Sequence, residues 1–387
     1  MNSRAEIGQR ELLAIDGEHG SKIVNEVASM SPTLSHGLVD FAFGEVFARA
    51  ELGRRDREMI TAGILGAMGG AEPQLCVHLN AALNVGADGD ELIALAEHVA
   101  VYSGFPRALN LLREVISILN HRKVTRSIPP KRVRVGDHEV DLVDTGGELP
   151  PVILLHALGL DHRMWRDVIP ILARTNRVIA YDLRGHGRAA LAPCAANMDA
   201  FVADLATVMD SLRIPKASIV GLSFGGGIAQ CFAIQHPSKV DRLTLVATTA
   251  WAQPAFVDRA EAAERDGMQA QIVPTLTRWF TMDALAVNDW TVRYARERVL
   301  RAHVEDWAAT WRSFSTIHID DRLSEISCPT LLLAGEMDPS TPPALMEKLS
   351  KAIPSAQFHV IKGAPHMLSL ESPGPLADRI AAFLATH

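Results

Sequence analysis

The sequence predicts two domains of different class: an all-α helical domain at the N-terminus and, after it, an α/β domain that carries a helical lid. Three observations lead to this prediction. A chain of 387 residues is too long for one ordinary hydrophobic core. Residues 1–122 show helical periodicity throughout. Beyond residue 132, short apolar runs typical of buried strands alternate with helical segments.

The composition is that of an ordinary globular protein. Hydrophobic residues make up 48% of the chain and charged residues 21%, as expected for folded domains. The net charge of −7 argues against nucleic acid as a partner. Because no apolar run begins the chain or could span a bilayer, we expect neither a signal peptide nor membrane insertion. Four scattered cysteines without a C-x-x-C pair indicate free thiols in a cytoplasmic protein, and no metal site is expected.

The first domain is predicted to consist of helices without strands. Apolar residues recur at spacings of three and four, and glycine or proline follows each run, as at helix ends. The clearest helices are expected over residues 54–68, 72–84, 88–102 and 108–120. Residues 123–131 contain Pro129-Pro130 among basic side chains and are predicted to form a linker. The predicted domains are therefore 1–122 and 132–387.

The second domain is predicted to contain a parallel sheet covered on both faces by helices. A hairpin is expected around Gly136-Asp137, and apolar strands follow it along the chain. These strands are expected at residues 152–155, 177–181, 218–220, 243–246, 330–333 and 357–361. Ligands of such sheets bind beyond the carboxyl ends of the strands. Mostly helical sequence from about 251 to 323 interrupts the alternation and predicts an inserted lid.

Ser223 lies in the pentapeptide Gly221-Leu222-Ser223-Phe224-Gly225. A predicted strand precedes it, and a predicted helix over 226–235 follows. This strand, turn and helix form the context in which a G-x-S-x-G sequence exposes a nucleophile at the top of a sheet. The glycines suit a strained turn in which larger side chains would clash. We therefore interpret Ser223 as a candidate nucleophile.

A serine hydroxyl needs a base to take its proton and a third group to orient that base. Asp338 follows a predicted strand, and His366 follows the last strand, in the order serine, acid, histidine. The interval between Ser223 and Asp338 leaves room for the lid. Glu336 is an alternative acid, although its earlier place in the strand makes it less suitable. The alternative bases are His156, His162 and His186.

The tetrahedral intermediate of acyl transfer also needs donors for its oxyanion. The backbone N–H of Phe224, directly after the nucleophile, is one candidate. The second should come from the loop after an early strand, where His156-Ala157-Leu158-Gly159 lies, and Leu158 is our choice.

Residues 132–387 resemble the α/β-hydrolase fold and, within it, the 3-oxoadipate enol-lactonase branch. The matching segments are 156–159, 161–165, 181–187, the serine pentapeptide with Gly226 and Ala229-Gln230, Trp279-Phe280-Thr281, and 335–338. Ala189 stands where a small polar residue is usual, and Phe314 to Asp320 differ from the lactonase pattern. Other ester and lactone hydrolases share the remaining motifs, so the resemblance is more specific for the fold than for the substrate.

Residues 8–120 resemble the 4-carboxymuconolactone decarboxylase family. The matching positions are 43–49, Leu52, Arg57-Glu58, Leu75, His78, 81–83, Gly86, Glu91 and 102–106, and Ala50-Glu51 replaces a usual proline-glycine pair. The resemblance implies decarboxylation without a cofactor: the protein stabilises the charge left by carbon dioxide and returns a proton.

His78 is the best candidate for that proton transfer. Leu75 and Ala82 lie three residues before and four after it, so the imidazole is predicted to point into the bundle. The alternative is an ordinary hydrogen-bonded core histidine. Glu45 and Arg49, four residues apart, form either a surface pair or the second half of the site. Thiol redox chemistry is rejected, because Cys76 is the one cysteine near His78 in the sequence.

Together the two resemblances predict consecutive reactions on one chain: decarboxylation of 4-carboxymuconolactone, then hydrolysis of 3-oxoadipate enol-lactone. The substrate is a small anion, so cations should line its pocket. Candidate substrate-binding residues are Arg163, Trp165, Trp279 and Arg278, with Arg293 and Arg296 as further cations. No cofactor is expected. Decarboxylase-family domains self-associate, so a homo-oligomer formed through the helical domain is expected.

Three alternatives stay open from the sequence. The helical domain serves as an oligomerisation scaffold without activity of its own. The hydrolase acts on another ester, lactone or ring-cleavage product, as the departures in the lid allow. The chain is a ligand receptor built on a hydrolase fold, although the intact set of serine, acid and histidine argues against a receptor.

Overall fold

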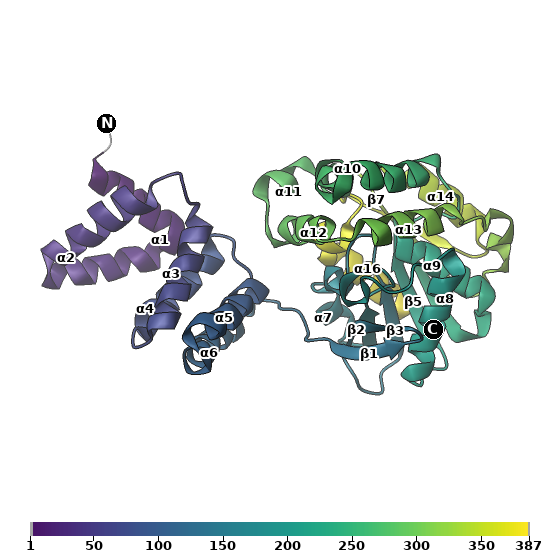
Figure 1. The fold of residues 1–387 in the computed structure, drawn as a ribbon, viewed down its shortest axis with the longest axis horizontal. Helices are drawn as coiled ribbons and strands as arrows, with labels where there is room; N and C mark the ends of the chain where they lie inside the picture. The colour runs from purple at the N-terminus through teal and green to yellow at the C-terminus, as the bar shows by residue number, and fades with distance from the viewer. Residues whose placement is uncertain (1–2, 386–387) are drawn as a thin grey trace. The chain divides into compact units, whose positions relative to one another are not determined.

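A computed structural model describes residues 3–385 of the protein. The chain separates into two compact units, divided between Arg126 and Ser127 (Figure 1). The first unit is helical, and the second contains a largely parallel sheet with helices around it. The predicted fold class is therefore confirmed. Within the described residues, no helix combines the length and apolar character needed to cross a membrane.

The N-terminal unit is built from helices alone within its described part. Its elements are α1 (Arg4–Met30), α2 (Pro32–His36), the π-helix η1 (Gly37–Phe47), α3 (Arg54–Met68), α4 (Glu72–Asn84), α5 (Gly89–Ser103) and α6 (Phe105–Arg122). Asp88 caps α5, because its side chain accepts from the N–H groups of Asp90 and Glu91. Leu79, Leu92 and Leu111 are fully buried where α4, α5 and α6 meet.

The C-terminal unit is organised by one eight-stranded sheet. Its strands are β1 (Lys131–Val135), β2 (His138–Asp144), β3 (Pro151–Leu155), β4 (Arg177–Tyr181), β5 (Ala217–Leu222), β6 (Val240–Val246), β7 (Thr330–Gly335) and β8 (Gln357–Ile361). The spatial order is β1-β2-β4-β3-β5-β6-β7-β8. Strands β1 and β2 are antiparallel to their neighbours, and β3 through β8 run parallel, so the carboxyl ends of β3 through β8 meet at one edge of the sheet.

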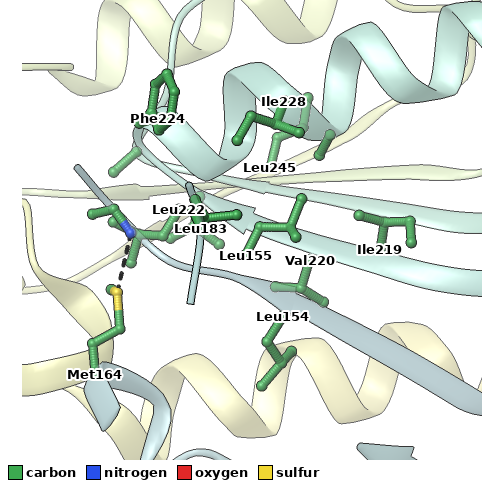
Figure 2. Close-up of a cluster of buried hydrophobic side chains, with 14 of the residues drawn as sticks. Leu154, Leu155, Met164, Leu183, Ile219, Val220, Leu222, Phe224, Ile228 and Leu245 are labelled. Atoms are coloured by element: carbon green, nitrogen blue, oxygen red, sulfur yellow. Dashed lines mark hydrogen bonds between the residues drawn. The ribbon is translucent and has the colours of Figure 1, made fainter. Parts of the chain in front are cut away.

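Helices follow most of the parallel strands. They are α7 (Ile169–Leu172), α8 (Met198–Ser211), α9 (Phe224–Gln235), α14 (Pro343–Ala352), α15 (Leu368–Glu371) and α16 (Pro373–Leu384), with short 3₁₀ turns η2 (His162–Trp165), η3 (Gly187–Ala189) and η4 (Pro237–Lys239). The central strands are apolar on both faces because helices cover both. Figure 2 shows their buried core, including Leu155 on β3 and Leu222 on β5.

The loop after β3 is anchored in this core. In Figure 2, the dashed line joins the thioether sulfur of Met164 to the backbone nitrogen of Ala157, a distance of 3.2 Å. Met164 is fully buried, so its position is fixed by packing. The loop that precedes the candidate oxyanion donor Leu158 is therefore held against the sheet.

The lid lies between β6 and β7 in sequence. It contains α10 (Pro254–Trp279), α11 (Met282–Val287), α12 (Trp290–Leu300), α13 (Val304–Ser315) and the 3₁₀ turn η5 (Asp320–Glu325). In Figure 1, α10, α12 and α13 gather on one side of the sheet domain. A bridge between Trp251 and His318 joins the two ends of the insertion. Helix α10 is interrupted at Gly267, whose φ of 76° is not helical.

Candidate active site

The backbone at Ser223 has the strained geometry of a nucleophile turn. Ser223 has φ 54° and ψ −114°, a region that L-residues rarely occupy, between the end of β5 and the start of α9. A Cβ at Gly225 would lie 2.3 Å from the carbonyl oxygen of Leu155, and one at Gly221 would lie 2.2 Å from that of Gly225. Glycine is therefore required at both positions for the turn to close.

Ser223, His366 and Asp338 form a continuous hydrogen-bonded chain. The Oγ of Ser223 lies 3.1 Å from Nε2 of His366, and Nδ1 of His366 lies 2.8 Å from Oδ2 of Asp338. His366 and Asp338 are buried, at 4% and 2% exposure. In this geometry the imidazole can take the serine proton while the carboxylate orients it.

Asp338 is held as a carboxylate by a set of donors. The N–H groups of Ser340 and Thr341 lie 2.7 and 3.0 Å from Oδ1, and the hydroxyl of Thr341 donates to Oδ2 over 2.6 Å. Burial opposes ionisation, but His366 and the Thr341 donors outweigh it and lower the pKa of Asp338. The acid is therefore charged and fixed in orientation around neutral pH.

The alternative acid Glu336 has a different partner. Its carboxylate accepts from the N–H of Gly363 over 2.8 Å on the exposed side of the loop. No hydrogen bond joins Glu336 to His366 within residues 3–385. The chain therefore presents Asp338, and not Glu336, to the imidazole.

The alternative histidines are engaged elsewhere. Nε2 of His156 accepts from the N–H of Leu183 over 2.8 Å, and burial, then the neighbouring His186, lower the pKa of His156 to about 3. Nδ1 of His162 is hydrogen-bonded to Asp182 over 2.6 Å. These side chains tie together the loops after β3 and β4.

Three of the loop side chains come close enough to share a metal ion. Single ligand atoms of Asp161, His162 and Asp182 lie within 4.8 Å of one another. Arg163 and Arg298 already pair with Asp161, at 2.6 and 3.2 Å. Because these partners and the bond between His162 and Asp182 satisfy the cluster, we assign it to loop structure.

The two candidate oxyanion donors flank Ser223. Phe224 is the first residue of α9, and the first N–H groups of a helix have no acceptor within it. Leu158 lines the same pocket as Ser223. Gly159, the next residue, has φ +80°, and a Cβ there would lie 2.5 Å from the ring of Trp307 in the lid. The lid therefore packs directly against the loop that presents Leu158.

A pocket opens beside Ser223 and His366. Its lining residues are Leu158, Ser223, Thr248, Thr249, Gln253, Phe256, Arg259, Arg278, Trp279, Trp311, Phe314, Ser340, Thr341, His366 and Met367. Ser223 and His366 lie in the segments that follow β5 and β8. The lid helices α10 and α13 contribute the aromatic and cationic side chains of the pocket wall. This arrangement suits a small substrate that carries negative charge.

The charge in this pocket is carried by Arg259 and Arg278. Within the described residues neither forms an ion pair: Arg278 donates to the hydroxyl of Thr275 over 3.3 Å, and Arg259 lies 4.7 Å from the centre of the Trp311 ring. Burial, then the like charge of Arg259, lower the pKa of Arg278 to about 10, and burial lowers that of Arg259. Both stay charged at pH 7; Asp258 partly offsets the effect of burial on Arg259, and no carboxylate forms an ion pair with either arginine among the described residues.

The predicted substrate-binding residues divide into two groups. Arg278 and Trp279 line the pocket, whereas Arg163 and Trp165 do not. Arg163 pairs with Asp161 in the turn after β3, and Trp165 is fully buried in the core. Arg259 also lines the pocket but was not predicted from the sequence. It lies three residues after the buried Phe256 on α10, so the two side chains share the face of the helix that points into the domain.

His78 in the N-terminal unit is paired with a buried acid. Its Nδ1 lies 2.7 Å from Oε2 of Glu58, which is fully buried and whose other oxygen has no partner among the described residues. His78 lines a mostly apolar pocket of about 550 Å³ that also includes Asp16. Burial, then the charge of Glu58, raise the pKa of Asp16 to about 6.

Glu45 and Arg49 are not part of this cluster. Glu45 lies 3.7 Å from Arg49 and 3.2 Å from Arg4, with 60% and 72% of those arginine side chains exposed. Neither Glu45 nor Arg49 lines the His78 pocket. Of the two interpretations of Glu45 and Arg49, the structure therefore favours the surface pair. The acid beside His78 is Glu58, which is detectable in the sequence because it lies four residues before the buried Ala62 on α3.

Comparison with known proteins follows the division of the chain. The family model for the alpha/beta hydrolase fold matches residues 150–373, more than half of the sequence. The chain therefore belongs to the α/β-hydrolase fold family. A second model, for the carboxymuconolactone decarboxylase family, matches residues 32–116.

Curated relatives and solved structures are similar to a large part of the chain. 3-Oxoadipate enol-lactonase 1 of Acinetobacter baylyi is 29% identical over 237 residues, 61% of this chain and 88% of the relative. 2-Hydroxymuconate semialdehyde hydrolase of a Pseudomonas species is 29% identical over 277 residues, 69% of this chain and 95% of the relative. The crystal structure of the enol-lactonase from Burkholderia xenovorans LB400 is 26% identical with a TM-score of 0.64, covering 66% of this chain and all of that one.

Proposed function

We propose that the C-terminal unit hydrolyses 3-oxoadipate enol-lactone to 3-oxoadipate. The observation that carries the proposal is a pair of arginines, Arg259 and Arg278, that line the same pocket as Ser223 and His366 and form no ion pair among the described residues. Both arginines are partly buried and form no ion pair among the described residues, so a partner is expected to come from the ligand. The similarity to an enol-lactonase supports a lactone that carries a carboxylate.

In the proposed reaction, the Oγ of Ser223 bonds to the lactone carbonyl carbon while its proton passes to Nε2 of His366. The N–H groups of Leu158 and Phe224 stabilise the resulting oxyanion. The ring C–O bond then breaks, and the leaving enol oxygen takes the proton from His366. Water, deprotonated by His366, attacks the acyl-enzyme and regenerates the serine. Asp338 holds the imidazole throughout.

The arginine pair gives a direct test of substrate charge. Replacing Arg278 with glutamine should lower kcat/KM for the enol-lactone by about 10- to 100-fold, because a hydrogen bond to a charged group contributes roughly 1.5–3 kcal/mol. The change should lie mainly in KM and should be small for p-nitrophenyl acetate, a neutral ester. Steady-state kinetics on both substrates measure it.

Arg312→Gln is the matched control, since Arg312 is an exposed lid cation that pairs with Glu264 and does not line the pocket. It should change neither substrate appreciably. Equal losses on the lactone and the neutral ester in Arg278→Gln would contradict a role in charge recognition.

A second activity is proposed for the N-terminal unit: decarboxylation of 4-carboxymuconolactone without a cofactor. The supporting observation is the His78–Glu58 pair at the wall of a large pocket, within the segment matched by the decarboxylase family model. As carbon dioxide leaves, the electrons of the broken C–C bond spread through the ring C=C bond onto the lactone carbonyl. His78 then returns a proton to the ring carbon next to that carbonyl, which gives the enol-lactone.

The scaffold alternative also has an observation in its favour. The described lining of the His78 pocket includes Asp16 but no lysine or arginine. An anionic substrate would meet no cation there other than a protonated His78. The alternative for the C-terminal unit is hydrolysis of a ring-cleavage product, since one relative is a 2-hydroxymuconate semialdehyde hydrolase.

We propose that the N-terminal unit mediates self-association. Ile60, Ile64 and Met68 form an apolar stripe on α3, and each side chain is about half exposed or more. Tyr102 and Phe105 are exposed at 78% and 74%. Contiguous apolar surface of this kind marks interaction sites. Ile64→Glu is expected to shift the sedimentation coefficient toward that of the monomer. Arg113→Glu, at an exposed polar position of α6, should leave the coefficient unchanged. A monomeric wild type, or an Ile64→Glu variant that sediments like the wild type, would contradict the proposal.

A further inference from the structure

Trp311 carries an unsatisfied hydrogen-bond donor at the wall of the Ser223 pocket. The residue lies on lid helix α13, is 7% exposed and lines the pocket. Its indole Nε1–H has no partner among the described residues. Buried polar groups without partners are rare and destabilise the fold, so an acceptor for this donor is expected when the pocket is occupied. The pocket is the place from which an acceptor can come.

Other orphan indoles lack this setting. Trp165 and Trp307 also have buried Nε1–H groups without a partner in the described part of the chain, yet neither lines the Ser223 pocket. Trp307 lines a separate pocket together with Gly159. The combination of an unsatisfied donor, substrate-pocket lining and adjacent cations therefore distinguishes Trp311.

The Trp311 ring is fixed by its neighbours. Its centre lies 5.3 Å from that of Phe256 and 6.4 Å from that of Phe314. The guanidinium of Arg259 lies 4.7 Å from the Trp311 ring centre, within the range of a cation–π contact. The Trp311 ring thus contacts Arg259, while its buried Nε1–H has no partner among the described residues. Arg278 adds a second positive charge nearby.

We propose that Trp311 is a specificity-determining residue: its Nε1–H donates to the carboxylate of the substrate, and its ring positions Arg259 to pair with that carboxylate. Together with Arg278 these groups form a carboxylate recess in the wall of the pocket that contains Ser223. The inference rests on the proposed lactonase function and deepens it. It assigns the ligand class as a small lactone or ester whose acyl part ends in a carboxylate.

Two substitutions separate the functions of the indole. Trp311→Phe keeps an aromatic face for Arg259 but removes the N–H, and Trp311→Leu removes both. Kinetics are measured on 3-oxoadipate enol-lactone and on p-nitrophenyl acetate. Trp311→Phe should lower kcat/KM for the lactone about 10-fold, mainly through KM, since one hydrogen bond to a charged acceptor is lost. The neutral ester should change by less than about 2-fold, and Trp311→Leu should lose more selectivity than Trp311→Phe.

Trp307→Phe is the control, because it removes an orphan indole N–H from the same helix outside this pocket. It should leave the ratio of lactone to ester kcat/KM unchanged, even if both rates shift. If Trp311→Phe keeps the wild-type ratio, the role of Trp311 is overturned. A wild type that does not prefer the lactone over the neutral ester would instead overturn the proposed function.

A binding measurement covers the case in which a Trp311 variant fails to fold. Titrating the ¹⁵N-labelled wild-type chain with 3-oxoadipate, the reaction product, should shift one indole N–H resonance downfield as the bond forms. The dianion should do this and hexanal, an uncharged chain of the same length, should not. Saturable product binding without any indole shift would refute the donor role, whereas absence of binding would count against the lactonase proposal itself.

Discussion

Replacing Ser223 with alanine is expected to lower kcat for lactone hydrolysis by about 10⁴- to 10⁶-fold, the range found when a serine nucleophile of this kind is removed. The hydroxyl lies 3.1 Å from the base, and no other hydroxyl contacts Nε2 of His366 within residues 3–385. Residual rate would come from the oxyanion donors and substrate binding alone. Steady-state kinetics measure kcat, and mass spectrometry with an activated ester tests for the acyl-enzyme.

The matched control is Ser350→Ala, which removes an exposed hydroxyl on α14 that bonds to the carbonyl of Glu347. It should keep full activity. Retention of more than about one hundredth of wild-type kcat in Ser223→Ala, with an acyl-enzyme still formed, would contradict the nucleophile assignment. Absence of hydrolysis and acylation in the wild type would favour the receptor alternative.

Replacing His78 with alanine is expected to lower the rate of carbon dioxide release from 4-carboxymuconolactone by about 10²- to 10⁴-fold, the usual contribution of a positioned proton donor. Glu58 would remain but would lose the group that it orients. Hydrolysis of added 3-oxoadipate enol-lactone should be unchanged, because Ser223 lies in the other unit. Following carbon dioxide and 3-oxoadipate in one incubation measures both reactions.

His98→Ala controls for loss of a helical histidine, since His98 is exposed on α5 and does not line the pocket. Unchanged carbon dioxide release in His78→Ala would remove His78 from the mechanism. Wild-type protein that hydrolyses the lactone but releases no carbon dioxide would establish the scaffold alternative for the N-terminal unit.

Much of the fold could be predicted because local signals agree with tertiary structure. Helices Arg54–Met68 and Glu72–Asn84 and strands Arg177–Tyr181 and Gln357–Ile361 have the predicted bounds. Each is delimited by turn residues, and the central strands β3, β4, β5 and β7 show the continuous apolar pattern of burial on both faces. The expected lid is also present as α10 to α13 between β6 and β7.

The first 50 residues were not resolved into elements from the sequence. Helix α1 contains Gly17 with φ 60°, which breaks its register halfway. Residues Gly37–Phe47 form a π-helix, whose longer repeat disagrees with the spacing of three and four that identifies α-helices. Local periodicity therefore carries little information here, and packing between α1 and η1 decides the structure.

Chain order identified Ser223, Asp338 and His366 as candidates because each follows a recognisable strand. The recognition groups lack such a marker. Arg259 and Trp311 lie on lid helices, where an inward arginine and an outward one look alike until the helices pack together. Arg163 illustrates the converse, since it stands in a conspicuous motif yet is neutralised by Asp161. Ion pairing across loops is a tertiary property, so the sequence could not separate these arginines.

The division between Arg126 and Ser127 lies inside one continuous polypeptide. Ribosomes therefore produce the His78 unit and the Ser223 unit in a fixed ratio of one to one, whatever the level of expression. If both proposed reactions occur, a cell cannot adjust the dosage of one without the other. The rates of the two reactions would then be balanced by the turnover numbers of the two units alone. A slow decarboxylation would require a higher turnover number of the N-terminal unit, because that unit cannot be made in excess.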